Sequence, residues 1–186
     1  MEDIRKICND NLNHIRTMVN LVINEHYKKE YGSEILRKRG ICGASQEAIA
    51  IILLNKGIEV KKYSCPHKFS QTVYPYDHTF SVFDETIIDG GYFQAIDHFG
   101  LTKENMPKDE ILIFHYKKLG EVIDNFMLLS QHSESLKSEH VKDLTDQELR
   151  NRFLELWDYK NNEIYMVEEQ SFHQVIKKYA QNNLSR

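Results

Sequence analysis

The sequence predicts an α+β protein in which a central helix packs on a small antiparallel sheet, with further helices before and after them in the chain. Residues 42–55 form an apolar run long enough for a buried helix. Residues 78–89 contain two short β-rich runs around an Asp-Glu pair, as in a hairpin. Apolar residues also recur at helical spacing near both ends of the chain. The three patterns together are typical of the α+β class.

The length and the charge balance limit the classes of protein that fit. A chain of 186 residues suits one domain with an appendage and is long enough to bury a core. We expect residues 1–130 to form the domain and residues 131–186 to form a helical C-terminal extension packed on it. The 24 basic and 28 acidic residues give a net charge of -4, which makes no broad electrostatic case for a nucleic-acid partner.

The termini and the cysteines favour a cytoplasmic protein. The first residues, Met-Glu-Asp-Ile-Arg-Lys, lack the pattern of a signal peptide, and the longest apolar run, 48–54, is too short to span a membrane. Three cysteines form no disulfide framework and fit a reducing compartment. The Lys-, Asn- and Ile-rich composition suits a bacterium of low GC content. Secretion into a host-cell cytosol as an effector is therefore the alternative location.

The N-terminal part of the chain predicts one long helix over residues 3 to about 31. Its apolar residues at helical spacing are Ile4, Ile7, Cys8, Leu12, Ile15, Met18, Val19, Val22 and Ile23. Cys8 lies on this apolar face, where a free cysteine behaves as a small hydrophobe. Residues 31–39 are polar and basic, and they lead to a tight turn at Gly40.

The next helix, from Cys42 to about Asn55, is the one that carries chemistry. It is apolar nearly all round, so we expect it to be central, and Gly57 fits its end. The N–H groups of the first helical turn and the helix dipole favour a thiolate at Cys42 over the thiol. A thiol activated in this way still needs a base elsewhere in the chain.

A strand at 58–63 and a loop at 64–77 precede the predicted hairpin, which pairs His78–Phe83 with Thr86–Asp89. If Asp84 and Glu85 form the loop, His78 and Asp89 lie on one face as diagonal neighbours. The sequence thus predicts a histidine base beside a carboxylate that orients it.

The rest of the chain is predicted to form elements that support this helix and hairpin. A strand is expected within residues 110–117, a helix at 119–129 and an exposed connection at 130–140. The sequence Thr145-Asp-Gln-Glu148 is a capping box that opens a helix through Trp157. A last helix should cover about residues 167–180.

Several of these features together resemble the catalytic core of the transglutaminase-like branch of papain-fold cysteine enzymes. They are Gly40-x-Cys42 opening a helix, Leu-Leu-x-x-Gly-Ile after it, His78 starting a strand and Ile-Ile-Asp89 ending the next. The resemblance covers roughly residues 35–117 and implies a papain-like fold. Two features depart from the common pattern: Gly-Gly follows Asp89 where Pro-Thr is frequent, and His78 lacks the small-then-Trp continuation. Arylamine N-acetyltransferases share the triad order, but this chain is short for one and shows no acyl-CoA site.

The resemblance implies a Cys42–His78–Asp89 triad. Cys42 would be the nucleophile and form a thioester, with its own backbone N–H as an oxyanion donor. His78 would act as acid and base, and Asp89 would orient it. We therefore expect a thiol-dependent amide hydrolase, a cysteine protease or glutamine deamidase, that acts on a protein or peptide without a cofactor or metal. An amine acceptor would make it a transglutaminase or acyltransferase. A catalytically silent protein-binding module is the remaining alternative.

Other residues near the triad admit further hypotheses. Five residues are expected to line a substrate cleft: Gly40, Gly43, Tyr76, Gly90 and Tyr92. His98 or His115 could replace His78 as the base, although both fit ordinary loop or strand positions. A zinc site is the alternative for Cys65, His67, His78 and Asp89, without the paired spacing that is typical of such sites.

Overall fold

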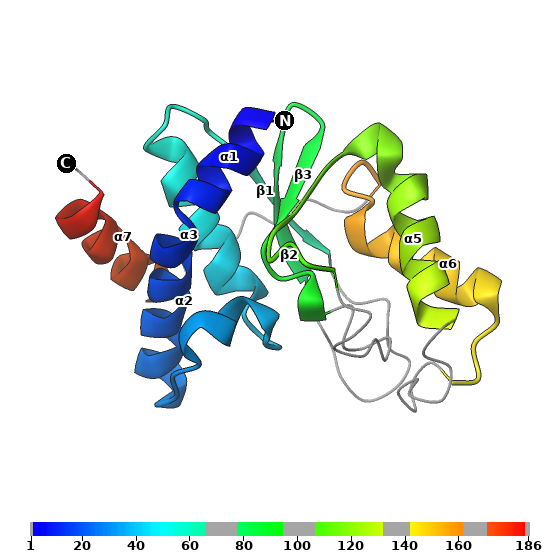
Figure 1. Cartoon of the computed structure of the whole chain (residues 1–186), viewed down its shortest axis with the longest axis horizontal. Helices are drawn as coiled ribbons and strands as arrows, with labels where there is room; N and C mark the ends of the chain where they lie inside the picture. Colours follow the sequence, from blue (N-terminus) through cyan, green and yellow to red (C-terminus); the bar gives the residue numbers. More distant parts are fainter. Residues whose placement is uncertain (1, 66–77, 95–106, 132–141, 162–170, 185–186) are drawn as a thin grey trace.

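A four-stranded antiparallel sheet stands between two groups of helices in the computed structural model (Figure 1). The structure describes residues 2–65, 78–94, 107–131, 142–161 and 171–184. Helices α1, α2, α3 and α7 lie on one side of the sheet, and α5 and α6 lie on the other. The expectation of an α+β protein with a helix packed on a small antiparallel sheet is confirmed.

The N-terminal segment forms two helices, α1 (Glu2–Asp10) and α2 (Leu12–Tyr27), so the prediction of one long helix is wrong. The break lies at Asn11, whose backbone (φ -109, ψ 12) leaves the helical region. Its side-chain amide donates to the carbonyl oxygen of Ile7 at 2.8 Å, which offers the backbone an alternative to continued helix. Helix α2 ends at Lys28, which adopts the left-handed conformation (φ 53).

The predicted central helix is α3 (Cys42–Leu54), and its start is confirmed. Gly57 adopts a positive φ of 77, and the N–H of Ile58 donates to the carbonyl of Leu53 at 3.0 Å, which ends the helix as expected. The polar segment before α3 contains a 3-10 helix, η1 (Gly32–Arg37).

The sheet has the order β1-β2-β3-β4, with β1 (Lys61–Cys65), β2 (His78–Phe83), β3 (Thr86–Asp89) and β4 (Leu112–His115). Strand β1 starts later than predicted, and Ile58, where the predicted strand begins, still bonds back to Leu53 at the end of α3. Strand β4 occupies only the middle of its predicted range.

The hairpin register is the one that the sequence predicts. Phe83 faces Thr86 and Ser81 faces Ile88, so Asp84 and Glu85 alone form the loop. Both loop residues have positive φ (43 and 59), as a two-residue hairpin turn with the right-handed twist of the strands requires.

The two faces of the sheet bury two separate apolar clusters. One cluster joins the sheet to α5 (Leu119–Gln131) and α6 (Asp146–Trp157). Its largest side chains are Phe80, Tyr92, Phe93, Phe114, Phe126, Phe153 and Trp157. The other cluster joins the opposite face to α1, α2 and α3. The central helix and the α5–α6 pair thus lie on opposite sides of the hairpin (Figure 1).

The C-terminal helices divide between the two sides. Helix α6 opens with the predicted capping box of Thr145 and Glu148 and packs on α5 and β1. Helix α7 (Ser171–Asn183) packs on α2 and α3, where His173 is hydrogen-bonded to Glu47 of α3 at 2.7 Å. The expected connection at 130–140 and the predicted start of the last helix fall largely outside the described residues. No helix in the described part of the chain is long and apolar enough to cross a membrane.

Candidate active site

The three predicted triad residues meet at one end of the hairpin. Nε2 of His78 lies 2.6 Å from Oδ2 of Asp89, and both side chains are almost completely buried. His78 is also hydrogen-bonded to the Cys42 thiol, which comes from the start of α3. Because Nε2 is bonded to the carboxylate, Nδ1 is the ring nitrogen left to form the hydrogen bond with the sulfur. The structure therefore brings together a thiol, an imidazole and a carboxylate in the order that cysteine catalysis requires.

The Cys42 thiol is half-buried and forms no disulfide. Burial alone would raise its pKa, but the hydrogen bond and charge of His78, with hydrogen bonds from Thr79, outweigh burial and lower the pKa below its usual value. Its position in the first turn of α3 acts in the same direction. The site thus favours the thiolate.

His78 shows the complementary shift. Burial opposes its charge, but the Asp89 carboxylate and the Cys42 sulfur favour the imidazolium and raise the pKa of His78 to about 10. With the pKa of Cys42 lowered and that of His78 raised, transfer of the thiol proton to the imidazole is favoured within the pair.

The Asp89 carboxylate accepts three hydrogen bonds. Oδ1 accepts from the backbone N–H of Gly91 at 2.8 Å, and Oδ2 accepts from His78. Oδ2 also accepts from Nε1 of Trp157 at 2.7 Å. Trp157 is the last residue of α6 and is fully buried. A helix from the far side of the sheet thus reaches the triad.

Thr79, the residue after His78, lies on the other face of β2 and also lowers the pKa of Cys42. Its hydroxyl oxygen is buried and has no hydrogen-bond partner among the described residues. The hydroxyl and the backbone N–H of Thr79 both stabilise the Cys42 thiolate, as the lowered pKa reflects. A buried hydroxyl without a partner costs free energy, and a thiolate at Cys42 would offer this hydroxyl an acceptor.

The Gly90–Gly91 pair lets the end of β3 approach α3. A Cβ on Gly91 would lie 2.6 Å from Cβ of Cys42 and 2.7 Å from its Cα. A Cβ on Gly90 would lie 2.6 Å from Cδ1 of Ile49 and 3.2 Å from Cβ of Ser45. Close backbone contact with the nucleophile helix therefore accounts for two glycines after the triad aspartate.

The structure corrects part of the predicted substrate cleft. Tyr92 is fully buried and its hydroxyl donates to the backbone carbonyl of Asp109, so it lines no cleft. Gly90 is buried beneath α3 and is likewise not a lining residue. Gly40 is exposed and Gly43 half-buried, so both remain compatible with a cleft, while Tyr76 lies outside the described residues.

The alternative chemistries gain no support from the described residues. His115 lies at the end of β4 beside Glu85, at 3.7 Å, and its ring accepts from the N–H of Lys117. Within the described ranges, no group of three or more His, Cys, Asp and Glu side chains is arranged to hold a metal ion. His67 and His98 lie outside those ranges.

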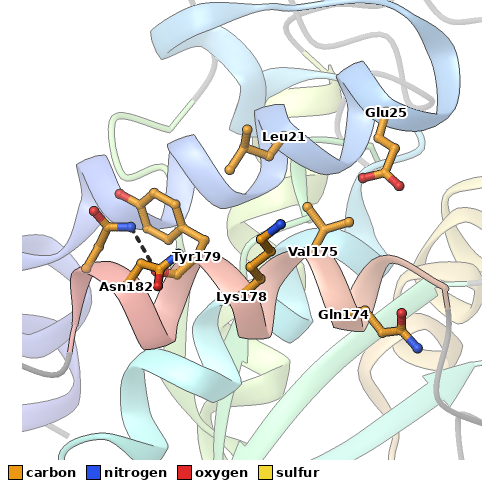
Figure 2. A pocket seen from close by; sticks show the side chains of 8 residues that line it. Leu21, Glu25, Gln174, Val175, Lys178, Tyr179 and Asn182 are labelled. Atoms are coloured by element: carbon orange, nitrogen blue, oxygen red, sulfur yellow. Dashed lines mark hydrogen bonds between the residues drawn. The ribbon is translucent and has the colours of Figure 1, made fainter.

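Away from the triad, a surface groove runs between α2 and α7 (Figure 2). Leu21 and Glu25 line it from α2, and Val175, Lys178 and Tyr179 line it from α7. None of the triad residues belongs to this lining, so the groove is separate from the thiol site.

Two residues of the site, Thr79 and Trp157, were not predicted from the sequence. Thr79 follows the predicted base directly, and its neighbour Ser81 shares its face, so the strand alternation could have placed it toward α3. Trp157 was predicted only as an apolar residue of a capped helix. Nothing local connects it with Asp89, 68 positions earlier.

Comparison of the chain with protein-family models, with curated proteins and with solved structures gives no match.

Proposed function

We propose that this protein is a thiol-dependent amide hydrolase with a papain-like core, which acts on a protein or peptide as a protease or glutamine deamidase. The observation that carries this proposal is the Cys42–His78–Asp89 arrangement. A half-buried thiol with a lowered pKa is hydrogen-bonded to a buried histidine, which is paired at 2.6 Å with a buried carboxylate. Such perturbed pKa values concentrate at functional sites.

The chemistry proceeds in two steps on this arrangement. The Cys42 thiolate attacks the carbonyl carbon of the substrate amide, and the His78 imidazolium donates its proton to the leaving nitrogen. This step breaks the C–N bond and leaves a thioester on Cys42 with a neutral His78. His78 then takes a proton from water as the hydroxide attacks the thioester carbonyl, which releases a carboxylic acid. The thiolate and imidazolium are thereby restored, and Asp89 holds the ring throughout.

The leaving nitrogen distinguishes the two hydrolytic activities. A main-chain amide releases a new peptide amine, whereas a glutamine side chain releases ammonia. The reactive groups are the same in both cases. A nucleophilic thiol is maintained most readily in a reducing compartment, which supports a cytosolic place of action in the producing cell or in a host cell.

The first test is alkylation of the purified protein with iodoacetamide between about pH 5 and 9, with each cysteine followed by mass spectrometry. We expect fast labelling of Cys42 at about pH 6 to 7, because the thiolate is present well below the pKa of a free cysteine, about 8.5. His78→Ala should abolish this labelling at low pH, and Cys8 serves as the internal control. Its burial raises the pKa of Cys8 to about 12, so it should stay unlabelled.

Screening with glutamine-containing peptide mixtures then separates the reactions. Ammonia release would indicate deamidation, new N-termini would indicate proteolysis, and incorporation of an added amine would indicate transfer. Cys42→Ser should remove the activity in each case. A Cys42 thiol that labels like a free cysteine in both wild type and His78→Ala would refute the proposed function and favour the silent binding module.

A further inference from the structure

Trp157, the single tryptophan of the chain, is the last residue of α6 and is fully buried next to the proposed triad. Its indole N–H donates to Oδ2 of Asp89, the same oxygen that is bonded to Nε2 of His78. A buried indole N–H needs an acceptor, and many such groups find a backbone carbonyl. Here the acceptor is the carboxylate of the proposed triad, so satisfying the indole also constrains the triad.

The indole is held in place independently of Asp89. It stacks on Phe126 at 5.3 Å between ring centroids with an interplanar angle of 20°, and on Phe153 at 6.3 Å and 11°. Phe114 of β4 meets it edge-on at 6.1 Å and 88°. The aromatic stack and the capped helix therefore fix the direction of the N–H before Asp89 contacts it.

The hydrogen bond has two consequences for Asp89. With donors from Gly91, His78 and Trp157, neither carboxylate oxygen is free to rotate away from its partner without breaking a buried hydrogen bond. The indole and the carboxylate are both fully buried, which keeps water from competing with His78 for Oδ2.

We propose that Trp157 is a positioning residue of the thiol site, whose indole N–H holds Oδ2 of Asp89 on Nε2 of His78. This inference rests on the proposed function. It makes α6 part of the catalytic unit, although every reacting group lies in the first 89 residues. Trp157 acts through Asp89 and His78 and does not contact the reacting sulfur.

The test removes the N–H and keeps the ring. Because the chain has one tryptophan, growth of a tryptophan auxotroph on β-(3-benzothienyl)alanine replaces only Trp157, with a sulfur in place of the indole N–H. The rate of Cys42 alkylation falls on the acid side of its pH profile, and we call this fall the acid limb. We expect its midpoint to move up by about one pH unit, with labelling at about pH 6 slowed about tenfold. Trp157→Phe, which also lacks the donor, should move the limb in the same direction.

Leu149→Ala is the matched control, because it removes buried apolar volume from the same helix and the same apolar cluster but leaves the aromatic stack and every hydrogen-bond donor in place. This variant should lower the urea midpoint of unfolding and leave the acid limb in place. Should the benzothienyl protein keep the wild-type acid limb while the wild type loses it on His78→Ala, Trp157 is structural only and the inference is overturned. A wild type without a low-pH thiolate would overturn the proposed function as well, so the two failures are distinguishable.

Discussion

At the scale of single residues, the lowered pKa of Cys42 depends on two consecutive residues of β2 that point to opposite faces of the sheet. His78 lies on the face that carries Asp89, and Thr79 lies on the face toward α3. The sequence predicts the pair of His78 and Asp89 because a two-residue loop fixes the register. It does not predict that the thiol also receives a hydrogen bond from Thr79, because that depends on how closely α3 approaches the strand.

Thr79→Val replaces the hydroxyl by a methyl group of similar size. We expect the acid limb of Cys42 alkylation to rise by about 0.4 to 1 pH unit, because the hydroxyl that helps to lower the pKa of Cys42 is gone. Stability should not fall, since the hydroxyl has no hydrogen-bond partner among the described residues. Ser81→Ala is the control: Ser81 lies on the same face and accepts from Gln46, and its loss should leave the Cys42 profile unchanged. An unchanged profile in Thr79→Val would mean that the hydroxyl does not act on the sulfur.

The pH dependence of turnover should differ from that of alkylation. As the pH falls through the lowered pKa of Cys42, the thiolate is protonated and both rates decline. As the pH rises through about 10, His78 loses its proton, and turnover declines because no acid protonates the leaving nitrogen. Alkylation needs only the thiolate and should continue above that pH. Measuring both rates between about pH 5 and 11 checks this, and a common alkaline decline would contradict it.

At the scale of elements, the local signals of the central helix and the hairpin were sufficient to predict them. The prediction of a single N-terminal helix failed because the apolar spacing continues past the break at Asn11. Strand β1 was placed too early because Ile58 alternates like a strand residue but bonds back to α3. In both places, a hydrogen bond from a single residue overrides the hydrophobic pattern.

The contact between the end of β3 and the start of α3 gives a prediction at this scale. Gly91→Ala should destabilise the protein by about 1–3 kcal/mol and slow Cys42 labelling, because the new methyl group meets the Cys42 backbone, which cannot rotate aside. Gly90→Ala should cost less and preserve the labelling profile, because the nearest atom is the flexible end of Ile49. Urea unfolding and alkylation of both variants check the order. Equal effects on labelling would show that the approach at Gly91 does not set the position of the thiol.

At the scale of the whole molecule, the proposed site draws on all three layers. Cys42 comes from the α3 layer, His78 and Asp89 come from the sheet, and Trp157 comes from the α5–α6 layer (Figure 1). A division of the chain near residue 130 would have separated Trp157 from the other three. The sequence could not predict this contact, because the helical pattern of α6 shows which face is apolar but not which strand it covers.

Phe153→Ala tests whether the layers unfold together. This fully buried ring stacks on Trp157 and Phe126, and its loss should cost about 3–5 kcal/mol. Trp157 fluorescence and Cys42 labelling should then report one common transition in urea, shifted to a lower midpoint. The exposed Asn151→Ala on the same helix should change stability by no more than about 0.5 kcal/mol. Two separate transitions would show that the α5–α6 layer folds independently of the thiol site.

The hydrogen bond from Trp157 to Asp89 also sets the time at which the proposed site of a newly made chain can be completed. The two residues are 68 positions apart, so at about 5–20 residues per second a ribosome adds Trp157 about 3 to 14 s after Asp89. During this interval the growing chain contains the cysteine, the histidine and the aspartate, but the carboxylate lacks its indole donor. With the role proposed for Trp157, the thiol of a nascent chain stays less reactive until α6 has left the ribosome.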